Sequence, residues 1–380
     1  MDFSYTDEQR ALQDTLGRFI EKDYDFDKRR KIAKSEAGFS REVWRQLAEL
    51  GLLGLPFPEA YGGVGGGPVD TMIVMELMGR GLVLEPYLSS AVIAGGLIRD
   101  AGSEAQKSTL LPAIAEGTLQ MSLAHLERGG RYDLAHVTTT AKADAGGYVI
   151  NGSKGVVLNG ASANKLIVSA RTSGAATDAA GISLFIVDKG APGLSVRGYQ
   201  TQDGGRAAEV DLKNVKVGAE ARIGAEGQAL AVIERAVDIA NAALCAEAVG
   251  IMTATNETTL DYIKTRKQFG QPIGKFQAIQ HRMADMIVAT EQAKSMSILA
   301  NVNAGSTNAA ERGRAIAGAK AYICQAARFV GQQAVQLHGG MGVTDEMKVS
   351  HYFKRLTMIN ATYGDADYHQ ARYSDTLLVA

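Results

Sequence analysis

The spacing of hydrophobic residues changes twice along the chain. In residues 6–116 they recur at the period of helices packed on one face. In residues 120–217 the period falls to two and β-branched residues dominate, as in the run ISLFIVD. Helical spacing then returns in three long stretches, 228–266, 275–303 and 309–337. The pattern therefore predicts a helical block, a block of strands and a second helical block.

These blocks indicate an α+β protein of three domains. A chain of 380 residues exceeds the roughly 250 to 300 residues at which one hydrophobic core stops growing. We predict an N-terminal helical domain over 1–118, a central antiparallel and barrel-like β domain over 119–217, and a C-terminal four-helix bundle over 218–380.

A stretch rich in proline and glycine interrupts the first helical block. In the segment LGLPFPEAYGGVGGGPVD, Pro56, Pro58 and five glycines between positions 62 and 67 break any regular element. A loop of this length is either functional or a connector, and both interpretations stay open.

Charge and composition exclude several classes of protein. The chain has 40 Lys and Arg against 41 Asp and Glu, without the basic excess that neutralises nucleic-acid phosphates. The opening MDFSYTDEQR is acidic and polar, unlike a secretory signal, and no apolar run approaches about 18 residues. Cys245 and Cys324 lie in Ala-rich helical patterns whose spacing matches no metal site. We expect a cytoplasmic protein with two buried thiols, no metal, no nucleic-acid partner and no membrane insertion.

Two motifs in the second helical block admit a structural and a functional interpretation. In KTRKQFGQPIG (264–274), basic residues followed by Gly270 are typical of a helix end with a left-handed cap. The same residues suit a dinucleotide, because Arg266 offers a planar fork for a pyrophosphate and Phe269 a flat face. In QAVQLHGGMGVT (333–344), glycines after a helix either cap it or let a phosphate approach the backbone. His338 is expected to be a packed or capping residue.

Together these motifs resemble the acyl-CoA dehydrogenase family over essentially the whole chain. The resemblance implies the fold of that family and a flavin, FAD, that is shared between subunits. The helix end and the glycine turn of one chain would then hold the adenine-diphosphate end of an FAD bound mainly in its neighbour. The stretches that carry the resemblance are LGLLGLPFPEAYGG, YVINGSK, TRKQFGQPIGKFQAIQHRMADM and QLHGGMGVTDEMKVSHYFKR. The residues given this role by resemblance are Arg266, Gln268, Phe269, Phe276, Gln277, Gln336, Gly339 and Gly340.

The chain departs from the family where the flavin ring would bind. The family's reaction removes an α-proton with a carboxylate and a β-hydride with flavin N5. Its ring-contacting segment TEPGAGSD is replaced here by AHLERGGRYD (124–133). Its Trp-Ile-Thr or Trp-Ile-Ser is replaced by Val156, Val157 and Leu158. Two hydroxyl contacts to the flavin edge are therefore expected to be absent.

The catalytic carboxylate is also absent from its two usual positions, which are occupied by Tyr363 and Ala240. Glu234 lies six residues before Ala240, which turns it by about 240° around a helix and moves it about 9 Å along it. Asp365 lies two residues beyond Tyr363, and its shorter side chain is more typical of a turn cap than of a base. Both remain weak candidates for a relocated base.

The losses are selective, because the adenine-end residues are kept and the ring-end residues are lost. This pattern resembles the small subunits of heteromeric acyl-CoA dehydrogenases, including those acting on pimeloyl-CoA and on the CoA thioesters of steroid side chains. It implies a heterotetramer with a catalytic partner subunit, an acyl-CoA substrate from fatty acid or steroid side-chain degradation, and an electron-transfer flavoprotein as acceptor. The alternatives are a self-sufficient homo-oligomer with a relocated base, and a flavin-free scaffold or CoA-thioester-binding protein.

Overall fold

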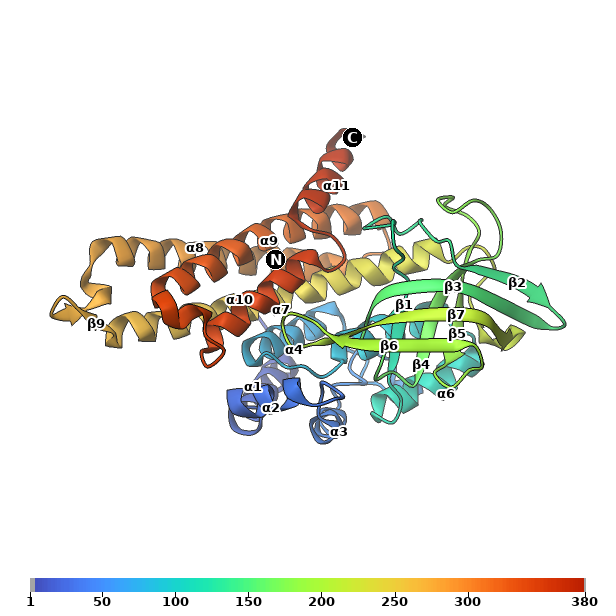
Figure 1. Cartoon of the computed structure of the whole chain (residues 1–380), viewed down its shortest axis with the longest axis horizontal. Coiled ribbons are helices and arrows are strands. Elements are labelled where there is room, and N and C mark those ends of the chain that lie inside the picture. The colour runs from blue at the N-terminus through green and yellow to red at the C-terminus, as the bar shows by residue number, and fades with distance from the viewer. Residues whose placement is uncertain (1–3, 379–380) are drawn as a thin grey trace. The chain divides into compact units, whose positions relative to one another are not determined.

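The computed structural model describes residues 4–378 and contains helices and one large sheet (Figure 1). Capping boxes start two of the early helices: the side chains of Thr6 and Ser103 accept from backbone N–H groups, and the glutamines three residues on reach back. The helices of the first block are α1 (Asp7–Asp23), α2 (Phe26–Lys34), α3 (Arg41–Glu49), α4 (Pro68–Gly81), α5 (Gly95–Ala101) and α6 (Glu104–Ala115), with a short 3₁₀-helix at Glu59–Tyr61 and a π-helix at Leu88–Ala94.

The central block forms one eight-stranded sheet in the order β6-β7-β3-β2-β4-β5-β8, with β1 paired to β4. The path from β6 to β8 does not close, so the barrel-like arrangement expected from the sequence is wrong. The β1–β4 and β2–β4 pairs are parallel, so the sheet is mixed and not purely antiparallel. The strands are β1 (Met121–Ala124), β2 (Thr140–Asp144), β3 (Gly147–Leu158), β4 (Lys165–Arg171), β5 (Ile182–Asp188), β6 (Leu194–Gln200), β7 (Arg206–Gly218) and β8 (Arg222–Ile223).

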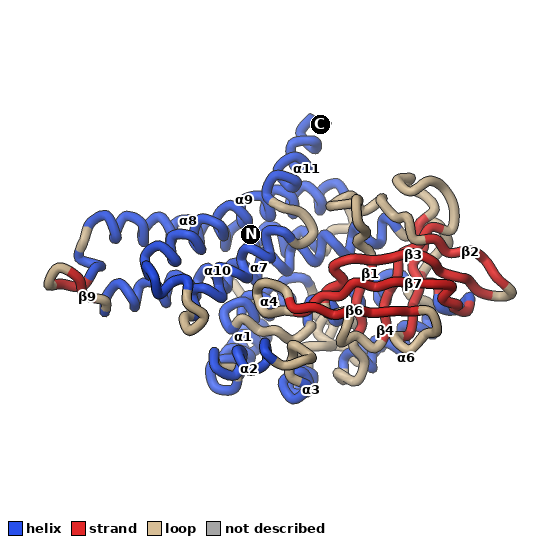
Figure 2. The backbone as a smooth tube through the Cα atoms, viewed as in Figure 1, coloured by secondary structure: helices blue, strands red, loops and turns tan. Residues whose placement is uncertain are grey.

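The last block is helical, as its periodicity predicts (Figure 2). A two-stranded hairpin, β9 (Lys267–Gln268) and β10 (Gln271–Pro272), connects its first two helices. Cys245 and Cys324 are buried and unbridged, as expected. The helices are α7 (Leu230–Thr265), α8 (Gln277–Ala304), α9 (Ala309–His338), α10 (Lys348–Ala361) and α11 (Ala366–Leu378), with short turns at Ile273–Lys275 and Gly339–Val343.

Helix α7 contains the most apolar long stretch found in residues 4–378. It contains an 18-residue window apolar enough to cross a membrane by length and composition. Of that window, 89% is buried inside the protein, as in the core helix of a soluble protein. The stretch is no uninterrupted apolar run, because charged and other polar residues lie among its alanines and larger apolar side chains.

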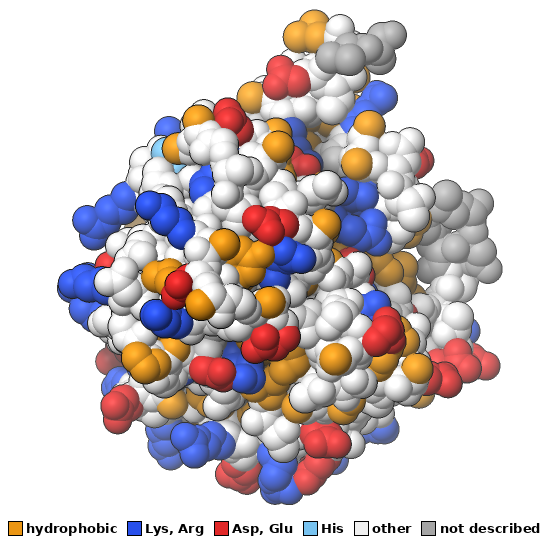
Figure 3. Space-filling view, turned by 90° about the vertical axis from the view of Figure 1, so that its right-hand side faces the viewer, with side chains coloured by type: hydrophobic (Ala, Val, Ile, Leu, Met, Phe, Trp, Pro, Cys, Tyr) orange, Lys and Arg blue, Asp and Glu red, His pale blue; other side chains and the backbone are white. Residues whose placement is uncertain are grey.

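The chain divides into two compact units, each described by itself below. The first comprises 1–31, 68–83 and 241–380, and the second comprises 32–67 and 84–240. The sheet lies in the second unit, around a core of apolar side chains that includes Ile150, Phe185 and Val210. On the face shown in Figure 3, basic and acidic side chains alternate, which agrees with a net charge of −1.

Candidate functional site

The first of the two motifs forms an exposed hairpin at the end of α7 (Figure 2). Phe269 and Gly270 occupy its two-residue turn with φ angles of 51° and 81°. Gly270 is therefore a hairpin-turn residue, and the helix cap expected from the sequence is wrong. The left-handed conformation is unfavourable for Phe269, and it leaves the ring 91% exposed. Its ring meets the ring of Phe276 edge-on, with 6.0 Å between centroids.

The side chain of Arg266 is exposed and does not cap the helix. Among residues 4–378 its guanidinium makes no hydrogen bond and no ion pair, whereas a capping arginine would donate to the last carbonyls of α7. The whole planar fork therefore faces solvent. This favours the interpretation of Arg266 as an anion-binding residue.

Two aromatic residues bring the two motifs together. Tyr262, near the end of α7, stacks on His338 at the end of α9 with ring centroids 4.3 Å apart, and its hydroxyl donates to the His338 carbonyl at 3.3 Å. His338 is buried and its Nδ1 bonds the Ala334 carbonyl at 2.8 Å, so it is a packed residue, as expected. The sequence analysis missed Tyr262. Tyr262 lies four residues before Arg266, and this spacing places the two side chains on the same face of a helix.

The glycine turn beside this stack leaves its backbone accessible. Gly339 has a φ of 59°, and a side chain at Gly339 or Gly340 would meet no atom within 4 Å. Gln336 is exposed one turn earlier, and Gln277 is exposed as the first residue of α8. All eight residues assigned to the adenine end belong to the first compact unit. Phe276 is half-buried, and the other seven are exposed.

The usual position of the catalytic base lies in a turn that buried side chains hold in place. Tyr363 has a φ of 55°, and its carbonyl accepts from Asn241 Nδ2 at 3.2 Å and from His369 Nε2 at 3.1 Å. The buried Lys320 donates its ammonium protons to the carbonyls of Ile359 at 2.9 Å and Thr362 at 3.3 Å. These donors come from α7, α9 and α11. The turn is therefore fixed without any ligand.

The groups in this turn are unsuited to removing a proton. Burial raises the pKa of the Tyr363 phenol well above its ordinary value, so the phenol stays neutral. Burial, together with the positive charge of Lys320, lowers the pKa of His369 to about 3. Asp365 Oδ1 accepts from the Tyr368 N–H at 2.9 Å, which is the geometry of a cap at the start of α11.

The other base position, on α7, is equally unsuited. Ala240 and Asn241 are buried and have no ionisable side chain. Glu234 is exposed, six residues earlier on the same helix. The next residue, Arg235, pairs with Asp100 at 3.2 Å. The two candidate carboxylates are therefore placed differently: Asp365 caps α11, and Glu234 is exposed on α7 six residues before Ala240.

The segment that would contact the flavin ring is anchored to the sheet by a buried ion pair. Lys154 Nζ on β3 bonds Glu127 Oε1 at 2.6 Å, Ser169 Oγ at 2.9 Å and the His125 carbonyl at 3.2 Å. The Glu127 carboxylate also accepts from the backbone N–H of Thr138 at 2.6 Å and of Thr139 at 3.0 Å. Gly155 N–H donates to the Leu126 carbonyl at 2.8 Å.

The pKa shifts of Glu127 and His125 agree with this anchoring. Burial by itself would raise the pKa of Glu127, but the Lys154 ammonium and the hydrogen bonds hold it below its ordinary value. Burial, together with the charge of Lys154, lowers the pKa of His125 to about 3, so its imidazole is neutral. This network was not predicted, because Lys154 stands in the polar, glycine-rich stretch NGSKG, which gives no signal of a buried partner.

The face above this network offers apolar groups where the family has hydroxyls. Leu126 lies in the segment that replaces TEPGAGSD, Leu158 ends the segment that replaces Trp-Ile-Thr, and both are half-buried. Val156 between them sits at a register shift of β3 against β7, with a φ of 51° and 47% of its surface exposed. A β-branched residue in this conformation is strained. These apolar side chains can themselves offer no hydrogen bond to a flavin ring.

The two ends of FAD thus fit this chain unequally. At the adenine end, an unpaired guanidinium and an accessible glycine backbone are donors of the kind that bind a pyrophosphate. At the ring end, Leu126 and Leu158 supply no donor, and neither base position carries a carboxylate. In the chain's described part, residues 4–378, no cluster of His, Cys, Asp and Glu could hold a metal ion.

Comparisons with known proteins cover the same three blocks. Residues 6–118 match the N-terminal domain of acyl-CoA dehydrogenase, 122–215 the middle domain and 227–377 the C-terminal domain. The mitochondrial isovaleryl-CoA dehydrogenase of Pongo abelii is 32% identical over 370 residues, which cover 95% of this chain and 86% of that protein.

Solved structures show the same fold over the full length. The ChsE4-ChsE5 complex from Mycobacterium tuberculosis has a chain with a TM-score of 0.89 at 26% identity, covering 100% of both chains. A variant of the Tcur3481-Tcur3483 steroid ACAD has a TM-score of 0.87 at 30% identity, covering 98% of both chains. This chain is a member of the acyl-CoA dehydrogenase family, whose enzymes are FAD-dependent oxidoreductases acting on the CH–CH bond of acyl-CoA thioesters.

Proposed function

We propose that this chain is the non-catalytic subunit of a heteromeric acyl-CoA dehydrogenase, and that it supplies the adenine-end half of a flavin site to a partner chain. The observation that carries the proposal is the unequal fit of the two ends of FAD. Arg266 and the Gly339–Gly340 turn are open to a ligand from outside, whereas Leu126, Leu158 and Tyr363 leave the chain's own ring site without donors or base.

Similar proteins give the proposal a precedent. A chain of the ChsE4-ChsE5 complex and a chain of the Tcur3481-Tcur3483 steroid ACAD, each named for two components, share this fold over nearly the full length. A heterotetramer with a catalytic subunit fits that precedent. The substrate would be an acyl-CoA from fatty acid or steroid side-chain degradation, the acceptor an electron-transfer flavoprotein, and the compartment the cytoplasm.

Two other functions have less support. A self-sufficient homo-oligomer would need a relocated base, but Asp365 is engaged as a helix cap and Glu234 is exposed on α7. A flavin-free scaffold or CoA-thioester-binding protein would have no use for an exposed Phe269 beside an unpaired Arg266. The partner-subunit proposal accounts for both the retained and the missing groups.

The test is to purify the chain alone and together with acyl-CoA dehydrogenases encoded near its gene. Flavin absorbance, native mass and acyl-CoA-dependent flavin reduction are recorded for each preparation. We expect the isolated chain to bind FAD poorly and the complex to be yellow and active. A yellow homo-oligomer that reduces its flavin with an acyl-CoA at an ordinary enzymatic rate would overturn the proposal and return attention to Asp365 and Glu234.

A further inference from the structure

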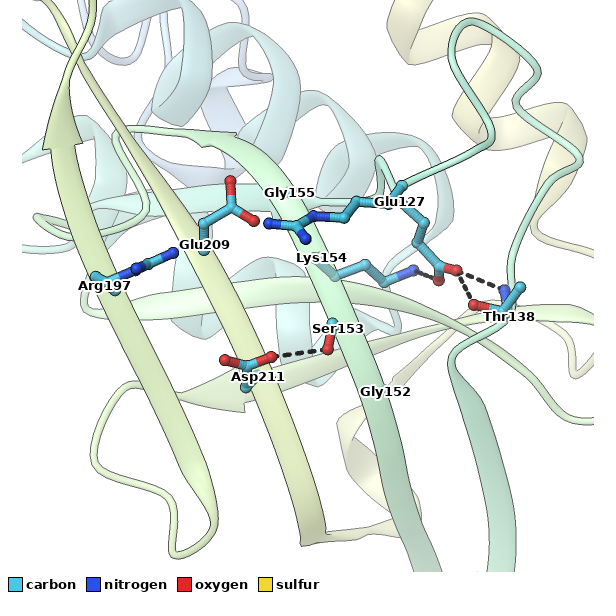
Figure 4. A pocket seen from close by; sticks show the side chains of 10 residues that line it. Glu127, Thr138, Gly152, Ser153, Lys154, Gly155, Arg197, Glu209 and Asp211 are labelled. Carbon is cyan, nitrogen blue, oxygen red and sulfur yellow. Dashed lines mark hydrogen bonds and ion pairs between the residues drawn. The ribbon is translucent and has the colours of Figure 1, made fainter.

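A polar cavity opens on the solvent-facing side of the sheet, over β3, β6 and β7 (Figure 4). Its volume is about 410 Å³, within the range of small-molecule sites. It lies in the second compact unit, which contains none of the adenine-end residues. The residues that line it are Glu127, Arg128, Thr138, Gly152, Ser153, Lys154, Gly155, Arg197, Glu209 and Asp211.

The floor of this cavity is rigid. Lys154 and Glu127 form their ion pair there at 2.6 Å, with side chains 0% and 2% exposed. The Thr138 backbone N–H and hydroxyl both donate to the same carboxylate (Figure 4). These groups satisfy one another, so the floor gives the cavity shape and fixed charge without needing a ligand.

The rim, by contrast, has unused hydrogen-bonding capacity. Among residues 4–378, the guanidinium groups of Arg128 and Arg197 make no hydrogen bond and no ion pair. Asp211 uses one oxygen, which accepts from Ser153 Oγ at 2.7 Å. Glu209 accepts only a long bond, from Tyr199 Oη at 3.4 Å. In Figure 4, Glu209 and Asp211 on β7 lie between Arg197 on β6 and Ser153 on β3.

The rim therefore combines strong donors with strong acceptors in one concave site. Guanidinium forks bind phosphate oxygens with paired, charge-assisted hydrogen bonds. Carboxylates beside them accept from hydroxyl groups, as the acidic residue of dinucleotide folds does from a ribose. A simple anion would use the arginines but would be repelled by Glu209 and Asp211. A ligand with both a phosphate and hydroxyl groups would satisfy all four side chains.

We propose that this cavity binds a phosphorylated, hydroxyl-bearing ligand of the sugar-phosphate or nucleotide class. Arg128 and Arg197 hold the phosphate, and Glu209 and Asp211 accept from the sugar hydroxyls. None of the adenine-end residues lines this cavity, since all of its groups come from the sheet unit. The proposal does not depend on the partner-subunit function.

The experiment titrates the full-length chain with ribose 5-phosphate, ADP and inorganic phosphate by calorimetry. We expect saturable binding of ribose 5-phosphate, weakened roughly tenfold or more by Arg197→Ala and by Arg128→Ala, because each loses a bond between charged groups. Lys213→Ala is the matched control, since Lys213 is an exposed cation on β7 that does not line the cavity. The control should bind as the wild type does.

A second variant separates phosphate recognition from sugar recognition. Glu209→Gln keeps the shape of the side chain but weakens its acceptor, so it should reduce affinity for ribose 5-phosphate several-fold and spare inorganic phosphate. ADP titrations are repeated with Arg266→Ala, which removes the adenine-end guanidinium. If ADP still binds to Arg266→Ala but not to Arg197→Ala, the cavity is the ADP site. If ribose 5-phosphate binds and ADP does not, the ligand is a sugar phosphate.

Three results would overturn the proposal. The first is the absence of saturable binding of both ribose 5-phosphate and ADP at millimolar concentration. The second is equal weakening by Arg197→Ala and Lys213→Ala, which indicates unspecific charge. The third is that Arg128→Ala and Arg197→Ala disturb assembly with another protein while leaving ligand affinity unchanged, which assigns the cavity to a protein contact.

Discussion

The end of the helical bundle and the sheet face beneath Leu126 and Leu158 differ in how their polar groups are satisfied. At the bundle end, the Arg266 guanidinium has no partner within residues 4–378 and Phe269 is 91% exposed. In the sheet, Lys154 makes three hydrogen bonds to neighbouring segments and is fully buried. The guanidinium of the first region is therefore free to meet a ligand, whereas the polar groups of the second already bond one another.

The comparison distinguishes residues that hold the shape of a site from residues that would touch its ligand. The Lys154–Glu127 pair and the donors around Tyr363 keep the shape of a ring site and of a base-bearing turn. The side chains that the family resemblance would place against a flavin ring or a substrate, Leu158 and Tyr363, lack the hydroxyl and carboxylate groups typical of that family. Supporting groups persist because removing one partner of a buried pair leaves an uncompensated charge. Contact groups at a surface can change without that cost to stability.

The largest effect on stability is expected from breaking the Lys154–Glu127 ion pair in the sheet. Lys154→Met should lower the free energy of unfolding by roughly 3 to 5 kcal/mol, because Glu127 is left buried without its partner. The measurement is urea denaturation followed by circular dichroism. Lys154→Met combined with Glu127→Leu should recover much of the loss, since no charge stays buried. A loss below about 1 kcal/mol in the single variant would show that the pair is no structural anchor.

The next largest effect is expected from changing Arg266 at the end of the bundle. Arg266→Ala should reduce the flavin content of the reconstituted complex by an amount equivalent to about 2 kcal/mol, because a charge-assisted bidentate contact is removed. Lys at this position should rescue only partly, since it lacks the planar fork. Lys267→Ala is the neighbouring control. Unchanged flavin occupancy with a lower melting temperature would instead make Arg266 a structural residue and remove the main support for action in trans.

A smaller effect concerns acid stability of the turn that carries Tyr363. The pKa of His369 is lowered by burial to about 3 from 6.5, so the folded state binds fewer protons than the unfolded state between these values. Stability therefore falls as pH decreases from 6.5 towards 3. His369→Gln should reduce this fall, measured as the shift in urea midpoint between pH 7 and pH 4.5. His281→Gln, an exposed histidine on α8, should leave the wild-type shift unchanged.

No effect on turnover is expected from Tyr363→Phe in the complex. The phenol is neutral because burial raises its pKa, and it fills the position of the missing carboxylate without replacing its chemistry. Steady-state turnover with an acyl-CoA and an artificial electron acceptor is the measurement. A hundredfold or greater loss of turnover would mean that the hydroxyl takes part in catalysis. Tyr363 would then be a residue that touches the substrate or flavin, and the distinction drawn above would not hold for it.

Much of the fold follows from local patterns in the sequence. The three long helices agree with their predicted ranges within a few residues, because an apolar stripe of helical period defines each of them. The open edges of the sheet and its parallel β1–β4 pair were not predicted. Strand order depends on contacts between distant segments, and alternation along one strand does not reveal its neighbours.

The sequence by itself determined which chemical groups are present: a guanidinium in the hairpin motif, leucines in place of hydroxyls, and a phenol in place of a carboxylate. Tertiary structure decided which of these groups are already engaged. Glu127 and Lys154 lie 27 residues apart and meet only because β1 and β3 come together in the sheet unit. Arg266 lies at an exposed hairpin after α7, and within residues 4–378 no acceptor reaches its guanidinium. Pairing and burial depend on neighbours in space, which local sequence does not specify.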